Sequence, residues 1–266
     1  MPVLASRGAR AATALGLAGD GFPPAALALF ARMSPTPSPA RKVLISQTIA
    51  SLTVAGVWQK LDMLQVYAAD AQANALLNWI SSSYNASLVN TPTFTTDRGF
   101  TFNGTTQYLD TGYNPSTGPK WGQNSHTFGR WMRSGSAGNV ADLGVNDGFG
   151  RTATIASNAA GVAYTVGDSS VTSTQATSPI GNIAAVRSVA GSFDIYKPGA
   201  SVANIVAVSN SGANLNFYVA ALNLSGAAAN FSSNEYSATY VGQSLNSTEM
   251  AALHSALQAY MTGVGA

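Results

Sequence analysis

The feature that most constrains this fold is a succession of short apolar or alternating segments after Tyr84, each followed by a cluster of Gly, Asn, Asp, Ser or Pro. Alternation of apolar and polar side chains is typical of a strand, because successive side chains point to opposite faces. The segments expected to form strands are Gly99–Phe102, Tyr108–Thr111, His126–Met132, Asn139–Leu143, Thr152–Ser157, Gly161–Val166, Ile183–Val189, Ser192–Lys197, Ile205–Ser209, Asn216–Leu222 and Tyr236–Gly242. The turn Asn146-Asp147-Gly148 is suited to a hairpin, since these residue types tolerate a positive φ. The pattern predicts a mainly β fold with two packed antiparallel sheets.

Helical patterns precede this β region. A short helix is expected over Ala25–Met33, after two prolines that a first turn tolerates. Apolar side chains recur at three- and four-residue steps over Ala40–Leu61, where Gly56 is expected to end the helix early. A strand is expected over Leu61–Tyr67. A further short helix is expected over Asp70–Ile80, with its first residue as the N-cap.

A helix is also expected at the C-terminus. Asn246 is suited to cap it, and Glu249 stands three residues further on, close to a capping-box pattern. Gly263 follows the last turn, where glycine commonly ends a helix.

Prolines at alternate positions in residues 34–39 predict an extended linker, because neither a helix nor a central strand accepts them. The chain is therefore expected to divide into three parts. These are an N-terminal arm ending in the linker (residues 1–42), a helical lead-in packed on the sandwich (43–84) and a β-sandwich domain with a closing helix (85–266).

Charged residues are scarce, at 9% of 266 residues, and the net charge is +2. A field this weak does not favour nucleic-acid binding, and no apolar run is long enough to insert into a membrane. The absence of cysteine excludes disulfides and thiolate chemistry. Arg7, Arg10 and Arg32 stand out near the N-terminus. They would either anchor the arm on an acidic protein surface or simply be solvated.

The sequence offers few groups for catalysis, and we expect the protein not to be an enzyme. Neither glutamate, Glu235 or Glu249, belongs to the alternating acid pair that sandwich glycosidases carry on one strand. The histidines, His126 and His254, lie far apart and outside any nucleophile-elbow pattern. A structural role is therefore expected for both histidines, because a triad has strict geometric requirements.

No metal or other cofactor is expected, although calcium stays open as an alternative. Asp142 and Asp147, with Asn146 beside the second, are the nearest set of oxygen ligands. Hairpin turns are rich in Asp and Asn for backbone reasons alone, which favours a structural interpretation of these residues.

One group of residues indicates a ligand. Tyr113, Trp121 and Phe149 fall in loops or at strand ends, close to Asn146 and Asp147. Sugar sites combine a stacking ring with amide and carboxylate groups, because a sugar has an apolar face and a polar rim. The sequence therefore predicts a glycan site at these five residues. The alternative is that the rings fill gaps between the loops and the core.

Gly99–Gly112 places Asn103-Gly104 between two expected strands, with Tyr108 in the second. Thr127–Met132 lies in a later expected strand, and Tyr236–Gly242 is followed by a helix. These segments resemble, in turn, a recurring stretch, a later strand and the closure of the concanavalin A-like (laminin-G-like) sandwich superfamily. The resemblance implies a jelly-roll sandwich in which Tyr108 enters the core. Members bind glycans, bind proteins, hydrolyse polysaccharides or only build architecture, so the resemblance leaves the activity open.

A second set of motifs follows in order along the chain: Gly56-Val57-Trp58-x-Lys60-Leu61-Asp62-x-Leu64, Leu77-Asn78-Trp79 and Asn90-Thr91-Pro92-Thr93-Phe94-x-x-Asp97-x-Gly99. This series resembles phage and prophage virion proteins more closely, and the resemblance covers about residues 45–266. The resemblance implies a structural virion protein on a particle surface: a head spike, fibre or tail-associated adhesin. Other virion proteins, copies of the same chain and a host polysaccharide would be its partners. A capsid-decorating protein without a glycan ligand and a polysaccharide depolymerase are the alternatives.

Overall fold

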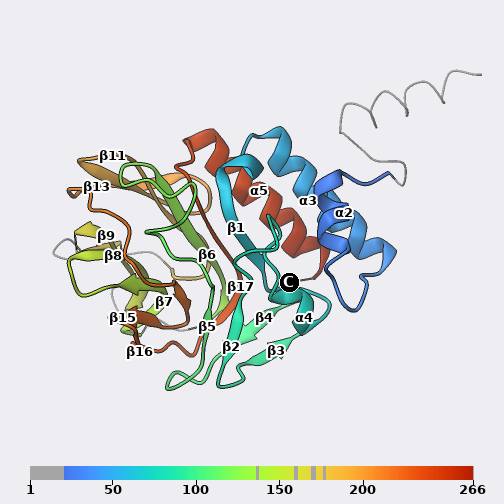
Figure 1. Ribbon diagram of the computed structural model, residues 1–266, viewed down its shortest axis with the longest axis horizontal. Coiled ribbons are helices and arrows are strands. Elements are labelled where there is room, and N and C mark those ends of the chain that lie inside the picture. The colour runs from blue at the N-terminus through green and yellow to red at the C-terminus, as the bar shows by residue number, and fades with distance from the viewer. Residues whose placement is uncertain (1–20, 136–137, 159–160, 169–171, 176–177, 266) are drawn as a thin grey trace, which may run out of the picture.

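The computed structural model describes residues 21–135, 138–158, 161–168, 172–175 and 178–265. Two β-sheets pack face to face, and helices cover the outer face of one of them (Figure 1). The predicted mainly β fold with two packed sheets is therefore confirmed.

The first sheet, sheet A, carries the helices. Its strands run in the order β13 (Ser201–Val206), β12 (Ser192–Tyr196), β11 (Gly181–Val189), β6 (His126–Ser134), β17 (Glu235–Gly242), β4 (Gly99–Thr101) and β3 (Thr93–Thr95). A further strand, β1 (Leu61–Val66), pairs with β17 beside β4. Every pairing described in sheet A is antiparallel, as predicted.

The second sheet, sheet B, is mixed. Its strands run in the order β10 (Thr172–Gln175), β9 (Gly161–Asp168), β8 (Arg151–Asn158), β7 (Val140–Asn146), β14 (Tyr218–Val219), β5 (Tyr108–Asp110) and β2 (Ser87–Val89). Beside this path, β15 (Leu222–Leu224) pairs with β16 (Ala227–Ala229) and, in parallel, with β7. The expectation of purely antiparallel sheets is wrong here. The chain runs antiparallel to β7 in β14, then reverses, so that β15 runs parallel to β7.

Two apolar cores hold these layers together. The inner core lies between the sheets, where Phe128, Ile183 and Phe193 of sheet A meet Leu143 and Ile155 of sheet B. The outer core lies between sheet A and the helices. Strand β17 is buried along its whole length, since both of its faces are covered.

The outer layer contains α2 (Pro24–Phe30), α3 (Pro39–Val54) and α5 (Ser247–Gly263), and α3 and α5 lie side by side (Figure 1). The apolar face of α5 includes Met250, Leu253 and Leu257, all buried. The predicted capping box is confirmed: Asn246 accepts from the Glu249 amide, and the Glu249 carboxylate accepts from the Asn246 amide. No helix in the described part of the chain has the length and apolarity needed to cross a bilayer.

The helix expected over residues 40–61 ends early, as predicted. It stops at Val54, and Gly56 follows with a φ of 75°. A short 3-10 helix, η1 (Trp58–Lys60), then leads into β1. The end of the predicted linker also starts α3: Ser38 caps the helix, and Pro39 lies in its first turn. The domain boundaries expected near residues 42 and 84 stay predictions.

The helix expected over Asp70–Ile80 is wrong. Only α4 (Gln72–Ala75) forms there, with Ala71 rather than Asp70 at its N-cap. The reason is that side-chain amides take over the backbone hydrogen bonds. The Asn78 Oδ1 atom accepts from the amides of Leu64 and Ile80, so the chain leaves the helix and docks on β1.

Smaller differences concern strand limits. The strand expected over Ile205–Ser209 begins earlier, at Ser201, and the segment 216–222 divides between β14 and β15. The short strands β2, β3, β10 and β16 are not predicted by the alternation pattern, because three or four residues carry too little of it. Tyr108 is only half-buried, and its neighbour Leu109 enters the core instead.

Candidate ligand-binding site

The turn between β7 and β8 forms one end of the sandwich. The Asn146 side chain accepts from the Gly148 amide at 2.9 Å, and the Asp147 side chain accepts from the Phe149 amide at 3.0 Å. Gly148 and Gly150 have positive φ values of 80° and 81°, which glycine adopts without strain. This conformation leaves the Phe149 ring 80% exposed at the tip of the turn.

A carboxylate and a guanidinium lie at the base of this turn. Asp147 is 6% exposed and pairs with Arg151 through Oδ2 and Nε, at 2.5 Å. The same Oδ2 atom accepts from the backbone amide of Asn214 at 3.3 Å. The Arg151 guanidinium lies over the Phe149 ring, 5.8 Å from its centroid. The two opposite charges therefore cancel locally.

Two open hollows meet at Arg151. The larger has a volume of about 480 Å³ and is lined by Asp147, Gly148, Phe149, Arg151, Asn214, Leu215 and Ser225. The smaller has a volume of about 260 Å³ and is lined by Pro115, Ser116, Trp121, Gln123, Arg151, Ser211 and Gly212. We call the two together the Arg151 groove. The turn after β7, the loop before β6, the loop before β14 and the turn after β15 supply its residues.

Trp121 forms an aromatic wall of the groove. Its ring stacks on His126, with centroids 4.0 Å apart and an interplanar angle of 3°, and also packs against Phe128 and Phe217. His126 is 2% exposed, and its Nδ1 atom lies 2.9 Å from the Gly122 carbonyl. Burial lowers the pKa of His126 to about 4, so the ring is neutral at neutral pH.

Exposed amides lie beside this wall. Asn114 donates to the Asn214 Oδ1 atom at 3.0 Å, and the Ser116 hydroxyl donates to the same atom at 2.9 Å. The Gln123 amide lies 3.3 Å from the Ser209 hydroxyl. Amides and hydroxyls held in this way present both donors and acceptors to a polar ligand.

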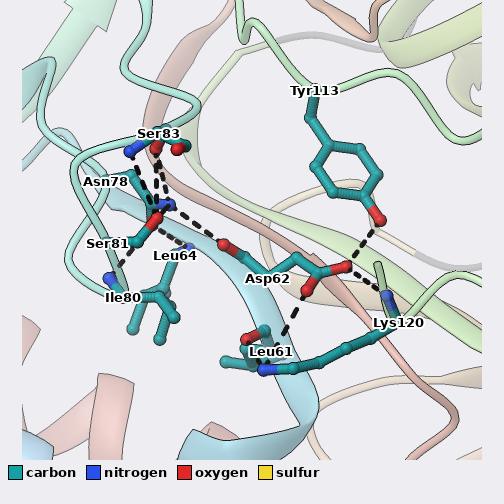
Figure 2. A network of polar contacts seen from close by, with 9 residues as sticks. All are labelled: Leu61, Asp62, Leu64, Asn78, Ile80, Ser81, Ser83, Tyr113 and Lys120. Atoms are coloured by element: carbon teal, nitrogen blue, oxygen red, sulfur yellow. Dashed lines mark hydrogen bonds and ion pairs between the residues drawn. The ribbon is translucent and has the colours of Figure 1, made fainter. Parts of the chain in front are cut away.

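A buried network positions the loop that carries Trp121. The Asp62 carboxylate, on β1, accepts from the Tyr113 hydroxyl and from the Lys120 amide, both at 2.9 Å (Figure 2). The Lys120 ammonium donates to the Leu61 carbonyl at 2.7 Å. The loop is thus fixed to sheet A immediately before Trp121 enters the groove.

The same network extends to the far side of β1. The Asn78 side chain donates to the carbonyls of Asp62 and Ser83, each at 2.9 Å, and accepts from Leu64 (Figure 2). Its Nδ2 group also lies 3.3 Å from the Ser81 hydroxyl. These bonds satisfy buried polar groups and give the network a structural role.

The prediction of Tyr113 as a sugar-stacking residue is wrong. Its side chain is fully buried in the inner core, with an edge-to-face contact to Tyr84. Burial and the nearby Asp62 carboxylate raise the pKa of Tyr113, so the phenol stays protonated. A ring near a strand end satisfies the sequence pattern whether it points outward or inward, and only packing decides.

The other predicted glycan residues come together in part. Trp121, Asp147 and Phe149 line the groove. Asn146 is half-buried just behind the turn, where its carbonyl accepts from the Ser225 amide. Sequence reasoning missed Arg151 and Asn214. Arg151 follows the predicted turn by three residues, which is a sequence signal for its place in the site. Asn214 has no such signal.

The predicted anchoring residues do not form a described surface. Arg7 and Arg10 lie outside the described residues. Arg32 is half-buried and donates to the Asn78 carbonyl at 2.8 Å, which fixes α2 on the loop before β2. A role for Arg32 in anchoring another protein is therefore at odds with its contacts within this chain.

The acidic residues considered for calcium or catalysis have partners within the fold. Asp142 is fully buried and accepts from Arg130, Ser157 and Tyr236. Glu235 is 4% exposed and pairs with Arg98 at 2.7 Å. Within the described ranges, no three His, Cys, Asp or Glu side chains lie close enough together to hold a metal ion.

Glu249 and His254 also have structural surroundings. Glu249 caps α5 and pairs with Lys60 at 2.7 Å. His254 stacks on Trp131, with centroids 5.6 Å apart, and burial lowers its pKa.

No protein-family model and no curated protein sequence matches this chain. Solved structures match in fold. A mutant of Trypanosoma rangeli sialidase displaying trans-sialidase activity has a TM-score of 0.56 and 11% identity, over 82% of this chain and 39% of that chain. T. rangeli sialidase in complex with sialic acid has a TM-score of 0.51 and 11% identity, over 74% of this chain and 33% of that chain. A mutant of HCR/D has a TM-score of 0.52 and 9% identity, over 74% of this chain and 52% of that chain.

These similarities concern the fold. The chain spans well under half of the two sialidase chains and about half of the HCR/D chain. At identities of 9% to 11%, the matches place the chain among β-sandwich structures.

Proposed function

We propose that the protein is a glycan-binding domain and that the Arg151 groove is its ligand site. The observation that carries this proposal is the pair of hollows that meet at Arg151, one lined by the 80% exposed Phe149 and the other by the half-buried Trp121. Asn214 lines the first hollow, and its Oδ1 atom accepts from Asn114. An exposed ring gives a sugar an apolar face to stack on, and fixed amides bind its hydroxyls.

The electrostatics of the groove favour a neutral sugar. The positive charge of Arg151 is offset by Asp147, so the groove holds no unpaired charge for an acidic residue of a polysaccharide. A sialylated ligand would add a second carboxylate at an arginine whose charge Asp147 already offsets through Nε. The sialidase that is similar in fold was solved with sialic acid. Neutral and sialylated glycans are therefore the two ligand classes to compare.

A glycan array followed by calorimetry with the best neutral oligosaccharide tests the proposal. Phe149→Ala should weaken binding at least about tenfold, the effect of losing a contact worth about 1.4 kcal/mol. Its unfolding free energy should change by no more than about 0.5 kcal/mol, since the ring is exposed. Val54→Ala, a 76% exposed valine on α3, is the matched control and should bind as the unaltered protein does. Equal affinity of the Phe149→Ala variant would contradict the proposal.

We further propose that the domain acts without hydrolysing its ligand, on the surface of a phage-like particle. The first part is supported by the described lining of the groove, in which one carboxylate, Asp147, is present and already paired with Arg151. Hydrolysis by a retaining or inverting route needs two carboxyl groups. Reducing-sugar release from a bound polysaccharide would contradict it.

The particle role and the concanavalin A-like jelly-roll connectivity rest on the sequence resemblance. Localisation on a virion, virion-protein partners and self-association belong to the same proposal. Mass spectrometry of purified particles, with labelling of the exposed domain, tests the particle role directly. A decorating protein without a glycan ligand is the alternative if the array gives no binding.

A further inference from the structure

Strand β13 is an edge strand without the usual protection. It ends sheet A and pairs with β12 on one side. No described residue pairs with its other side. The strand has six residues, whereas β3 at the opposite end of the sheet has three and lies between Pro92 and the charged pair Asp97 and Arg98. Proteins commonly protect sheet edges with short strands, proline and charge. At β13 the nearest charge and proline, Lys197 and Pro198, lie in the turn before the strand, and the six strand residues and those that follow carry neither up to Asn234.

The backbone of β13 presents hydrogen-bonding groups outward. The amides of Ala207 and Ser209 donate inward, to the carbonyls of Gly191 and Ala190. Because the direction of these groups alternates along an extended chain, those of Asn204, Val206 and Val208 point away from the sheet. Buried unpaired backbone groups are costly, so these groups need either water or another strand.

The side chains of this edge are apolar and exposed. Val206 is 84% exposed and Val208 71%, while Ala203 and Ile205, on the other face, pack against the inner core. Exposed large apolar side chains gathered at one edge are typical of an interaction surface.

The absence of charge on and after β13 favours a second copy of this chain as the partner. Residues 198–234 contain no Asp, Glu, Lys, Arg or His, so the strand and the segment that follows it are free of side-chain charge. In a two-fold symmetric contact, each residue at the axis meets its own copy, and any charge there would be repelled. An uncharged strand can pair with itself without this cost.

We infer that two copies of the chain associate through β13, antiparallel and about a two-fold axis at Val206. Val206 lies opposite Val206 of the second copy, and Asn204 lies opposite Val208. The outward backbone groups then pair across the axis, and the exposed valines of the two copies cover one another. Sheet A continues from one copy into the other.

Sedimentation equilibrium over a range of protein concentrations tests this inference. The unaltered protein should show a monomer–dimer equilibrium. Val206→Lys places two like charges at the axis and should raise the dimer dissociation constant at least about tenfold. Val54→Lys adds the same charge at another exposed valine, 76% exposed on α3 against 84% for Val206, and should leave the constant unchanged. A protein that stays monomeric up to its solubility limit would overturn the inference, as would loss of the dimer in Val54→Lys rather than in Val206→Lys.

A cysteine variant tests the register. The chain has no cysteine, so Val206→Cys introduces one thiol per copy. Opposed residues in an antiparallel hydrogen-bonded pair lie about 5.5 Å apart between Cα atoms, within disulfide range. Mild oxidation should convert most of this variant to a covalent dimer, while Val54→Cys stays mostly monomeric. Equal yields from the two variants would contradict the register at Val206.

Discussion

Two arginine–aspartate pairs in this molecule have the same chemistry and different depths. Arg130 and Asp142 are both fully buried between the sheets, at 2.6 Å, and Ser157 and Tyr236 complete the hydrogen bonds of the carboxylate. Asp147 and Arg151 pair at 2.5 Å at the open end, where 30% of the arginine side chain is exposed. The difference in depth makes the first pair structural and leaves the second accessible from outside, where we propose that a ligand binds. Around Asp142 the fold has used every oxygen, whereas Arg151 still borders two hollows.

The strongest test of this comparison removes the buried carboxylate. Asp142→Ala leaves the Arg130 guanidinium buried without its counter-ion, which should cost about 3–5 kcal/mol of unfolding free energy. Chemical denaturation followed by circular dichroism measures the loss. Replacing both residues, with Arg130→Met and Asp142→Leu, should recover part of that stability, because no unpaired charge remains. If the double variant were less stable than Asp142→Ala, burial of the lone charge would not be the cause.

A second test follows the pH dependence of stability that is due to His126, which stacks on Trp121 at the open end. The pKa of His126 is about 4 in the folded protein, below its ordinary value of 6.5. Between these values the unfolded chain binds more protons, so stability should rise with pH from 4 to 6.5 and be fully present above that range. Over this pH range, deprotonation of His126 should raise the free energy of unfolding by on the order of 3 kcal/mol.

The matched variant for this test is His126→Phe, which keeps the stack on Trp121. It should flatten the pH dependence of the denaturation midpoint, apart from the smaller contribution of His254, whose pKa is also lowered. The same pH slope in both proteins would show that His126 is not responsible.

The smallest of these effects concerns the open pair. Asp147→Ala removes the partner of Arg151 and the acceptor of the Phe149 and Asn214 amides, which should cost about 1–2 kcal/mol. The loss should therefore be clearly smaller than that for Asp142→Ala in the same denaturation experiment. Equal losses would mean that the open end is as tightly coupled to the core as the buried pair.

Much of the fold could be predicted from local patterns. The alternating segments predicted most of the longer strands, such as β8 and β12, because half-buried strands require alternation. The capping box at Asn246 and Glu249 gave the start of α5, because both partners lie within one turn. The helix expected at Asp70–Ile80 failed because Asn78 bonds to β1, a partner that local sequence does not reveal.

The candidate site could be predicted only in part. The turn around Phe149 could be predicted, and Gly148 and Gly150 adopt its positive φ values without strain, but the outward direction of the ring could not. Tyr113 could not be distinguished from Phe149 by sequence, because both are aromatic residues near turns. The buried Asp62 carboxylate holds the Tyr113 hydroxyl inside the molecule, and that partner comes from another strand.

By itself, the sequence determined the class of fold, the capped closing helix, the scarcity of charge and the turn that carries Phe149. These features depend on neighbours along the chain. The tertiary structure decided that Trp121, Arg151 and Asn214 meet at one end of the sandwich, that Tyr113 does not, and that β13 is left at an edge. Burial and long-range pairing decide these matters, and residues distant in sequence supply both.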